Sequence, residues 1–190
     1  HISYKGLNFE FTGNPNPEKK SVRGTYNGRN TIKVTPNSKE TVAHEMGHYL
    51  DALWAADLTG NESPNGTFLS DNNTVDSVDI MLNGGTDALD FTEHFASFID
   101  KISDAADKSS NYKNDPKEIF ARFFARFVGW TDVKANSFLL GNTDYGDYGR
   151  FKDSFTEEHF KEFVHILQEK SALDQRNKEK FQLKEPIEET

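Results

Sequence analysis

Two histidines and a glutamate are spaced in a way that suits hydrolytic metal chemistry. Residues 44–48, His-Glu-Met-Gly-His, form an HExxH motif. On a helix of about 3.6 residues per turn, His44 and His48 project from one face, where both imidazoles can bind one cation. Glu45 lies beside them, placed to take a proton from a metal-bound water rather than to bind the metal. The motif therefore predicts a metal site with a general base.

Two histidines do not complete such a site. Catalytic zinc takes three protein ligands and leaves its fourth position to water. The other four histidines are more typical of surface or core-edge positions, and none follows His48 at the spacing of a three-histidine motif. We therefore expect a carboxylate as the third ligand. The candidates are Asp51, Glu93 and Glu118.

The three carboxylates differ in their surroundings. Asp51 follows His48 by three residues, which favours a role in orienting an imidazole through its other nitrogen. Glu93 lies between two phenylalanines on a different predicted helix. Glu118 opens a very apolar helix, where an inward-facing carboxylate is costly unless a cation matches it. This favours Glu118 as the third ligand, although Arg122, four residues later, is an alternative partner for it.

Four helices are needed to position these residues, and the periodicity of the apolar residues predicts them. The second of the four contains Glu93, and the third begins at a proline, which suits the first position of a helix. The predicted helices cover Glu40 to about Ala56, Asp87 to about Lys108, Pro116 to Val128, and about Thr156 to Glu169.

The first forty residues predict strands instead. Short apolar-rich runs cover Leu7 to Phe11, Val22 to Tyr26 and Thr31 to Val34. The Asn27-Gly28-Arg29-Asn30 segment between the last two is typical of a hairpin turn. We expect a small antiparallel edge unit. Residues 57–86 are rich in Gly, Asn, Ser and Asp and predict a loop, with a short strand or helical turn at 78–82.

The chain of 190 residues is long enough for one core rather than two. We predict an α+β, zincin-like fold in a single domain over residues 1–170. Its parts are a sheet and the HExxH helix (1–56), a loop (57–86) and a helical lobe that carries the third ligand (87–170). Residues 171–190 are polar and lack periodicity, which predicts a tail.

Composition excludes several classes of protein. The net charge of −9 argues against general binding of nucleic-acid phosphates, and the mean hydropathy of −0.75 with no long apolar run argues against a membrane protein. The absence of cysteine removes thiolate nucleophiles and Cys-ligated metals. No Lys or Arg lies between Lys39 and Lys101, a stretch with twelve carboxylates that is either a solvated acidic face or a surface for a basic segment or cation.

Two segments together resemble a known family. Residues 41–51, Thr-Val-Ala-His-Glu-Met-Gly-His-Tyr-Leu-Asp, and residues 112–124, Tyr-Lys-Asn-Asp-Pro-Lys-Glu-Ile-Phe-Ala-Arg-Phe-Phe, are similar to the gluzincin-type metallopeptidase domain of large polyvalent proteins from phages and conjugative elements. They are similar, more distantly, to the catalytic domain of anthrax lethal factor. The similar blocks cover about residues 22–56 and 108–167.

The resemblance implies a role for each residue. His44, His48 and Glu118 would bind one Zn²⁺ per chain, Glu45 would be the base, and the hairpin before the helix would be the edge strand along which a peptide lies. Tyr112 would supply a hydroxyl that polarises the substrate carbonyl. Alternatively, that tyrosine packs against the neighbouring helix.

From these observations we expect a zinc-dependent endopeptidase whose partner is a peptide or protein substrate, without nucleic acid or membrane. Two alternatives stay open: a non-catalytic metal-bearing module of a larger mobile-element protein, and a metal-dependent hydrolase of non-peptide amides. The start at His1, with no initiator Met or leader, is typical of a mature form or an excised piece. The sequence leaves oligomeric state and compartment open, whether cytoplasmic or a delivered effector.

Overall fold

The structure is a computed structural model, and it describes residues 6–11, 24–35, 41–71, 74–106, 115–132 and 154–182. Three strands precede four helices in this part of the chain, so the predicted α+β class is correct and the fold is mainly helical. The elements are β1 (Asn8–Phe11), β2 (Gly24–Tyr26), β3 (Thr31–Val34), α1 (Val42–Thr59), α2 (Ser77–Ala105), α3 (Pro116–Asp132) and α6 (Glu157–Gln182).

The three strands form one sheet in the order β1-β3-β2. β2 and β3 pair antiparallel, as the hairpin signal predicts: the side chain of Asn27 accepts hydrogen bonds from three backbone N–H groups of the turn, and Gly28 takes a φ of 76°. β1 pairs with β3 in parallel, so the prediction of a fully antiparallel unit is wrong for β1. The sequence contains no turn signal that specifies the direction of β1, because the segment between β1 and β2 is longer than a hairpin turn.

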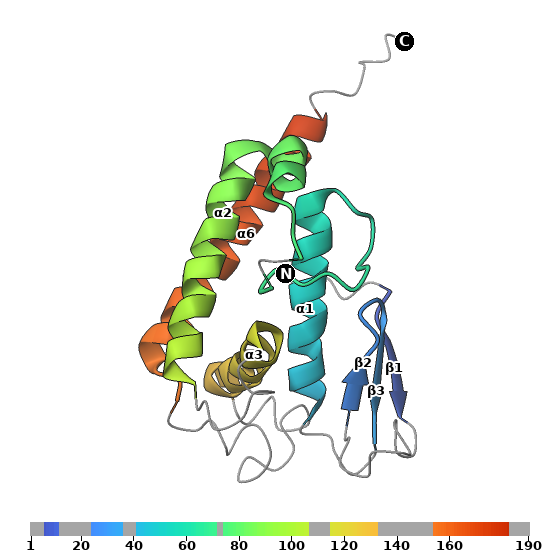
Figure 1. Ribbon diagram of the computed structural model, residues 1–190, viewed down its shortest axis with the longest axis vertical. Helices are drawn as coiled ribbons and strands as arrows, with labels where there is room; N and C mark the ends of the chain where they lie inside the picture. Colours follow the sequence, from blue (N-terminus) through green and yellow to red (C-terminus); the bar gives the residue numbers. More distant parts are fainter. Residues whose placement is uncertain are drawn as a thin grey trace.

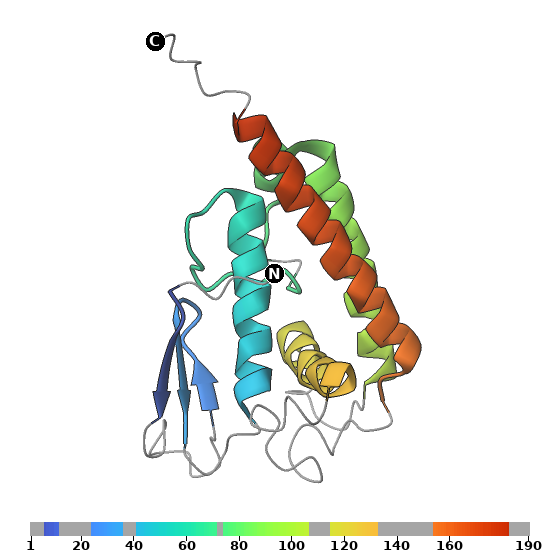
Figure 2. The same cartoon turned by 180° about the vertical axis from the view of Figure 1, so that it is seen from behind.

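α1 lies between the sheet and the other helices (Figures 1 and 2). Because it packs on both sides, it is buried over most of its surface, from Val42 to Leu58. It runs to Thr59, about one turn beyond the predicted end near Ala56. It stops at Gly60, whose φ of 78° is the left-handed conformation that ends many helices.

α2 begins ten residues earlier than predicted, at Ser77 rather than Asp87. The side chain of Asp76 caps it by accepting a hydrogen bond from the backbone N–H of Val78. A kink at Gly85, with φ 73° and ψ −162°, joins two helical segments. The helical turn predicted as one alternative at 78–82 is therefore part of α2. The prediction of a loop up to residue 86 is wrong, since Gly85 kinks a helix instead of separating it from a loop.

α6 is also longer than predicted and runs beside α2 (Figure 2). It continues to Gln182, well into the segment that we predicted as a polar tail. Two buried side chains hold this extension: Leu173 in the core, and Lys170, whose ammonium pairs with Asp174 at 2.6 Å and with Asp57 on α1 at 3.4 Å. The extension contains so few apolar positions that it has no detectable period in the sequence. Residues 183–190 lie outside the described part.

The core is built from aromatic side chains of all four helices. Phe163 of α6 is fully buried and packs edge-on against Phe127 and Phe123 of α3, with ring centroids 4.8 and 5.3 Å apart. Trp54 of α1 packs against Phe91 and Phe95 of α2. This core fixes α3 against α1. None of the helices in the described ranges is long and apolar enough to cross a membrane.

Candidate metal centre

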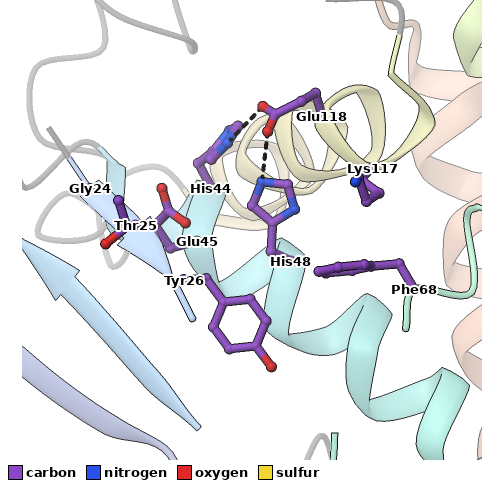
Figure 3. Close-up of a pocket in the computed structure, with 9 residues that line it drawn as sticks. All are labelled: Gly24, Thr25, Tyr26, His44, Glu45, His48, Phe68, Lys117 and Glu118. Atoms are coloured by element: carbon purple, nitrogen blue, oxygen red, sulfur yellow. Dashed lines mark ion pairs between the residues drawn. The ribbon is translucent and has the colours of Figure 1, made fainter. Parts of the chain in front are cut away.

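α1 and α3 bring together two imidazoles and one carboxylate. His44 Nε2 lies 3.3 Å from Glu118 Oε2, and His48 Nε2 lies 3.3 Å from Glu118 Oε1 (Figure 3). The two imidazole rings have centroids 4.8 Å apart. Among the residues that the structure describes, these three form the only group of His, Asp and Glu side chains with ligand atoms close enough to share an ion, all within 4.8 Å of one another. The group could hold a metal ion.

The approach of α3 to α1 depends on a glycine inside the motif. A Cβ added to Gly47 would lie 2.9 Å from Ala121 Cα and 3.0 Å from Phe124 Cβ, both on α3. Such distances are shorter than real carbon contacts, so only glycine allows the two backbones to come this close. Glu118 lies one turn before Ala121 on the same face of α3, so its carboxylate faces the side of α1 that presents the two histidines.

The two histidines stabilise the charged form of Glu118. Burial acts to raise the pKa of this carboxyl, but hydrogen bonds and charge from His44 and His48 outweigh it and hold the pKa far below its usual range. Arg122, the alternative partner from the sequence, has its Nη2 4.0 Å from Glu118 Oε2. The imidazoles are therefore the closer partners, and the anion stays charged at the pH where imidazoles can bind a metal.

The group opens into a pocket of about 260 Å³. Glu45, buried in α1, lines it and packs beside β2: a Cβ on Gly24 would lie 3.2 Å from Glu45 Oε1. Strand and helix thus confine the carboxylate to the pocket, on the β2 side of His44 (Figure 3). The lining residues are Gly24, Thr25, Tyr26, His44, Glu45, His48, Phe68, Lys117 and Glu118.

Asp51 has partners other than an imidazole. Its side chain is completely buried and accepts hydrogen bonds from both the backbone N–H and the hydroxyl of Ser70. Burial raises the pKa of Asp51 to about 6, while the two bonds to Ser70 and the charge of His48 act in the opposite direction. The carboxylate therefore ties the loop after α1 to the HExxH helix, and its negative charge acts on His48 from a distance.

The remaining candidates fall outside this group. Glu93 is exposed on α2 and is not part of the cluster. Tyr112 lies outside the described residues, so its predicted hydroxyl role stays a prediction.

Sequence reasoning missed two of the pocket residues, Phe68 and Lys117, whereas Tyr26 lies on a strand of the hairpin expected beside the site. Phe68 comes from the segment predicted as a loop, and its ring centroid lies 6.0 Å from that of His48. Lys117 immediately precedes the ligand candidate, a position that could have drawn attention to it. Tyr26 ends the predicted hairpin strand, but its hydroxyl points away from the histidines and donates to the carbonyl of Arg29 (Figure 3).

Comparisons with known proteins add no relative. No protein family, curated protein or solved structure matches the chain. The similarity to the gluzincin-type domain therefore rests on the two segments quoted from the sequence, and membership of that family stays a prediction.

Proposed function

We propose that this protein is a zincin-like, zinc-dependent endopeptidase. The observation that carries the proposal is the arrangement of the pocket: the His44–His48–Glu118 group and the carboxylate of Glu45 line the same cavity, beside strand β2. A group that only stabilised the fold would need no carboxylate in an open cavity beside it.

The size and the chemistry of the group suit one metal ion. His44 Nε2 and His48 Nε2 each lie 3.3 Å from an oxygen of Glu118, and one ligand atom from each of the three residues lies within 4.8 Å of the others. Two neutral imidazoles and one carboxylate, with no sulfur ligand, also form a donor set used by hydrolytic zinc sites.

Zinc at this site would lower the pKa of a water and polarise a substrate carbonyl. Glu45 would accept the proton of that water and pass it to the leaving amine. Its position favours this task, because the side chain is buried in α1 and lines the same pocket as the histidines. Tyr112 is proposed, on the resemblance alone, to donate a hydrogen bond to the oxyanion.

Strand β2 favours a peptide as the substrate. Among the described strands, β2 pairs with β3 only, so it forms one edge of the sheet, and its residues Gly24, Thr25 and Tyr26 line the pocket. An extended peptide can add to such an edge through backbone hydrogen bonds. That arrangement would bring a peptide bond past Glu45.

The test combines metal analysis with one substitution. Protein purified without chelator should contain one zinc per chain and cleave members of a proteome-derived peptide library. Glu45→Gln should retain the zinc and lose turnover, because an amide cannot accept the proton. Chelation should abolish cleavage in the wild type.

Two results would contradict the proposal. Full peptidase activity in Glu45→Gln would eliminate this residue as the base. Stoichiometric zinc without cleavage of any peptide would favour the non-catalytic metal-bearing module instead.

A further inference from the structure

One wall of the pocket carries a fixed positive charge. Lys117 is the only Lys or Arg among the pocket's described lining residues, and it lies on the Phe68 side, away from Gly24 and Glu45 (Figure 3). Lys117 precedes Glu118 in the first turn of α3, so the fold keeps its side chain near the metal centre. A ligand bound between the metal centre and the Phe68 ring therefore lies close to the Lys117 ammonium.

Lys117 is held in place by two groups. Its ammonium lies 5.4 Å from the centroid of the Phe68 ring, within the range of a cation–π contact. Its other partner is Asp115 at 3.5 Å, in a pair whose side chains are 32% and 39% exposed. An ion pair this open to water contributes little. A carboxylate brought by a ligand can therefore compete for the ammonium.

The Phe68 ring is itself anchored. It packs edge-on against His48 and Tyr26, with centroids 6.0 and 6.4 Å apart. Two residues further along, Ser70 binds the buried carboxylate of Asp51. The loop thus presents a fixed aromatic face beside the ammonium, which suits the methylene groups of a short acidic side chain.

The charges in the pocket favour an anion at this wall. A divalent cation on two neutral imidazoles and Glu118 leaves a net charge of about +1, and Lys117 adds another. Among the lining residues the remaining anion, Glu45, lies on the opposite, β2 side, while Asp115, outside the lining, pairs weakly with Lys117. A ligand ammonium beside Lys117 would be repelled, whereas a carboxylate would lie between two positive charges.

We infer that Lys117, steadied by Phe68, selects substrates that carry a carboxylate next to the bond presented to the metal centre. This inference rests on the proposed function, because it takes the pocket to be a peptide site. The carboxylate has two possible sources, an acidic side chain or the carboxyl terminus of the peptide. The preference for a carboxylate applies only next to Lys117, because the segment from Glu40 to Asp100 is strongly acidic and would repel an anion elsewhere.

The experiment measures binding rather than turnover. Zinc-loaded Glu45→Gln protein is titrated with four peptide probes that carry a hydroxamate on an amino-terminal succinyl group. The hydroxamate anchors at the metal, the adjacent residue is Glu or Gln, and the carboxyl terminus is either free or amidated. We expect a carboxylate to improve the dissociation constant about 2-fold to 5-fold, as for a partly exposed ion pair. The Glu amide tests the side-chain source, and the Gln free acid tests the terminal source.

Three variants in the same background assign the effect. Lys117→Gln should bring the ratio between acidic and amide probes to about one, and Lys117→Glu should invert it. Lys101→Gln, at an exposed lysine on α2 that pairs with Glu162, should keep the ratio. Zinc content, measured on each variant, reports whether Glu118 still holds its place.

Each outcome supports or overturns the inference. Equal binding of acidic and amide probes, or a ratio that survives Lys117→Gln with zinc retained, would overturn it while leaving the proposed function intact. A wild-type protein that cleaves no peptide, yet keeps the Lys117-dependent ratio, would reject the peptidase and retain the carboxylate site. If no probe binds in a zinc-dependent manner, both proposals fail.

Discussion

The aromatic core and the pocket use opposite means to hold their residues. In the core, Phe163, Phe123 and their neighbours pack ring against ring, so many similar contacts together stabilise the fold. In the pocket, few contacts act, and each is specific: a glycine that allows two helices to touch, and a buried carboxylate that holds one serine. α3 belongs to both, with Phe120 in the core and Glu118 in the pocket.

This difference implies that substitutions can change the stability of the fold and its zinc affinity independently. Changes in the core should lower the free energy of unfolding and leave the zinc affinity of the folded protein unchanged. Changes in the pocket should lower the zinc affinity and leave the free energy of unfolding nearly unchanged. α1 and α3 carry both functions on opposite faces, which makes the comparison testable within single helices.

The largest effect should come from Phe163→Ala. This side chain is 0% exposed, and its loss leaves a cavity surrounded by aromatic rings. We expect the free energy of unfolding to fall by about 3–5 kcal/mol. Urea denaturation in the presence of chelator measures the change, and zinc titration of the folded fraction should give an unchanged dissociation constant.

Two further variants support that measurement. Phe163→Leu, a milder change, covers the case in which the alanine variant does not fold. Leu82→Ala, at a side chain that is 80% exposed, should change stability by no more than about 0.5 kcal/mol. A core variant that folds but releases its zinc would break the separation between the two regions.

The second effect concerns the third ligand. Glu118→Gln should weaken zinc affinity by at least about 10-fold to 100-fold, the loss seen even for residues that only support a ligand. Glu93→Gln, at an exposed glutamate on α2, is the matched control and should leave affinity nearly unchanged. Competition with a fluorescent zinc chelator measures both. Affinity that falls with Glu93→Gln and survives Glu118→Gln would reverse the assignment.

A substitution at Gly47 should have a smaller effect, and it should affect both stability and zinc binding. Alanine usually stabilises a helix relative to glycine by about 0.5–1 kcal/mol. Here its Cβ would meet the backbone of Ala121 at 2.9 Å. We therefore expect Gly47→Ala to lower the free energy of unfolding by about 1–3 kcal/mol and to weaken zinc binding as α3 shifts. Stabilisation by this change would mean that the helices separate without loss.

The parts predicted from sequence share one property, which is that the signal is local. Helix periods, the Asn-Gly turn and the HExxH spacing each lie within a short segment, and the structure contains the corresponding elements. Glu118 was favoured because a carboxylate in an apolar helix is conspicuous. The structure brings it to His44 and His48.

The parts that sequence missed depend on contacts between distant segments. Nothing near Phe68 indicates that Ser70 binds Asp51, nineteen positions earlier, and so fixes the loop beside His48. The parallel pairing of β1 likewise depends on a partner more than twenty residues away. In both cases tertiary contacts decide the structure, and no periodic pattern records them.

The last effect concerns the pH dependence of stability, and it should follow from the contact between Asp51 and Ser70 that anchors this loop. Asp51→Asn keeps an oxygen to accept from the Ser70 N–H and removes the charge. Because burial raises the pKa of Asp51 to about 6 from an ordinary 3.8, the folded protein holds this proton more tightly than the unfolded chain. The stability that the group contributes is therefore present below about pH 4 and is lost as the pH rises through about 6.

Asp51→Asn should remove that loss. Relative to the variant, the free energy of unfolding of the wild type should fall between about pH 4 and 6, by at most about 1.4 kcal/mol per pH unit, the limit for one proton. Glu118 acts with the opposite sign, since its lowered pKa makes its contribution disappear as the pH falls below its ordinary value of 4.5. Subtracting the two stability profiles removes the contribution of Glu118, which both proteins share. Parallel curves across this range would show that Asp51 titrates normally, and that the loop carrying Phe68 is held without a buried charge.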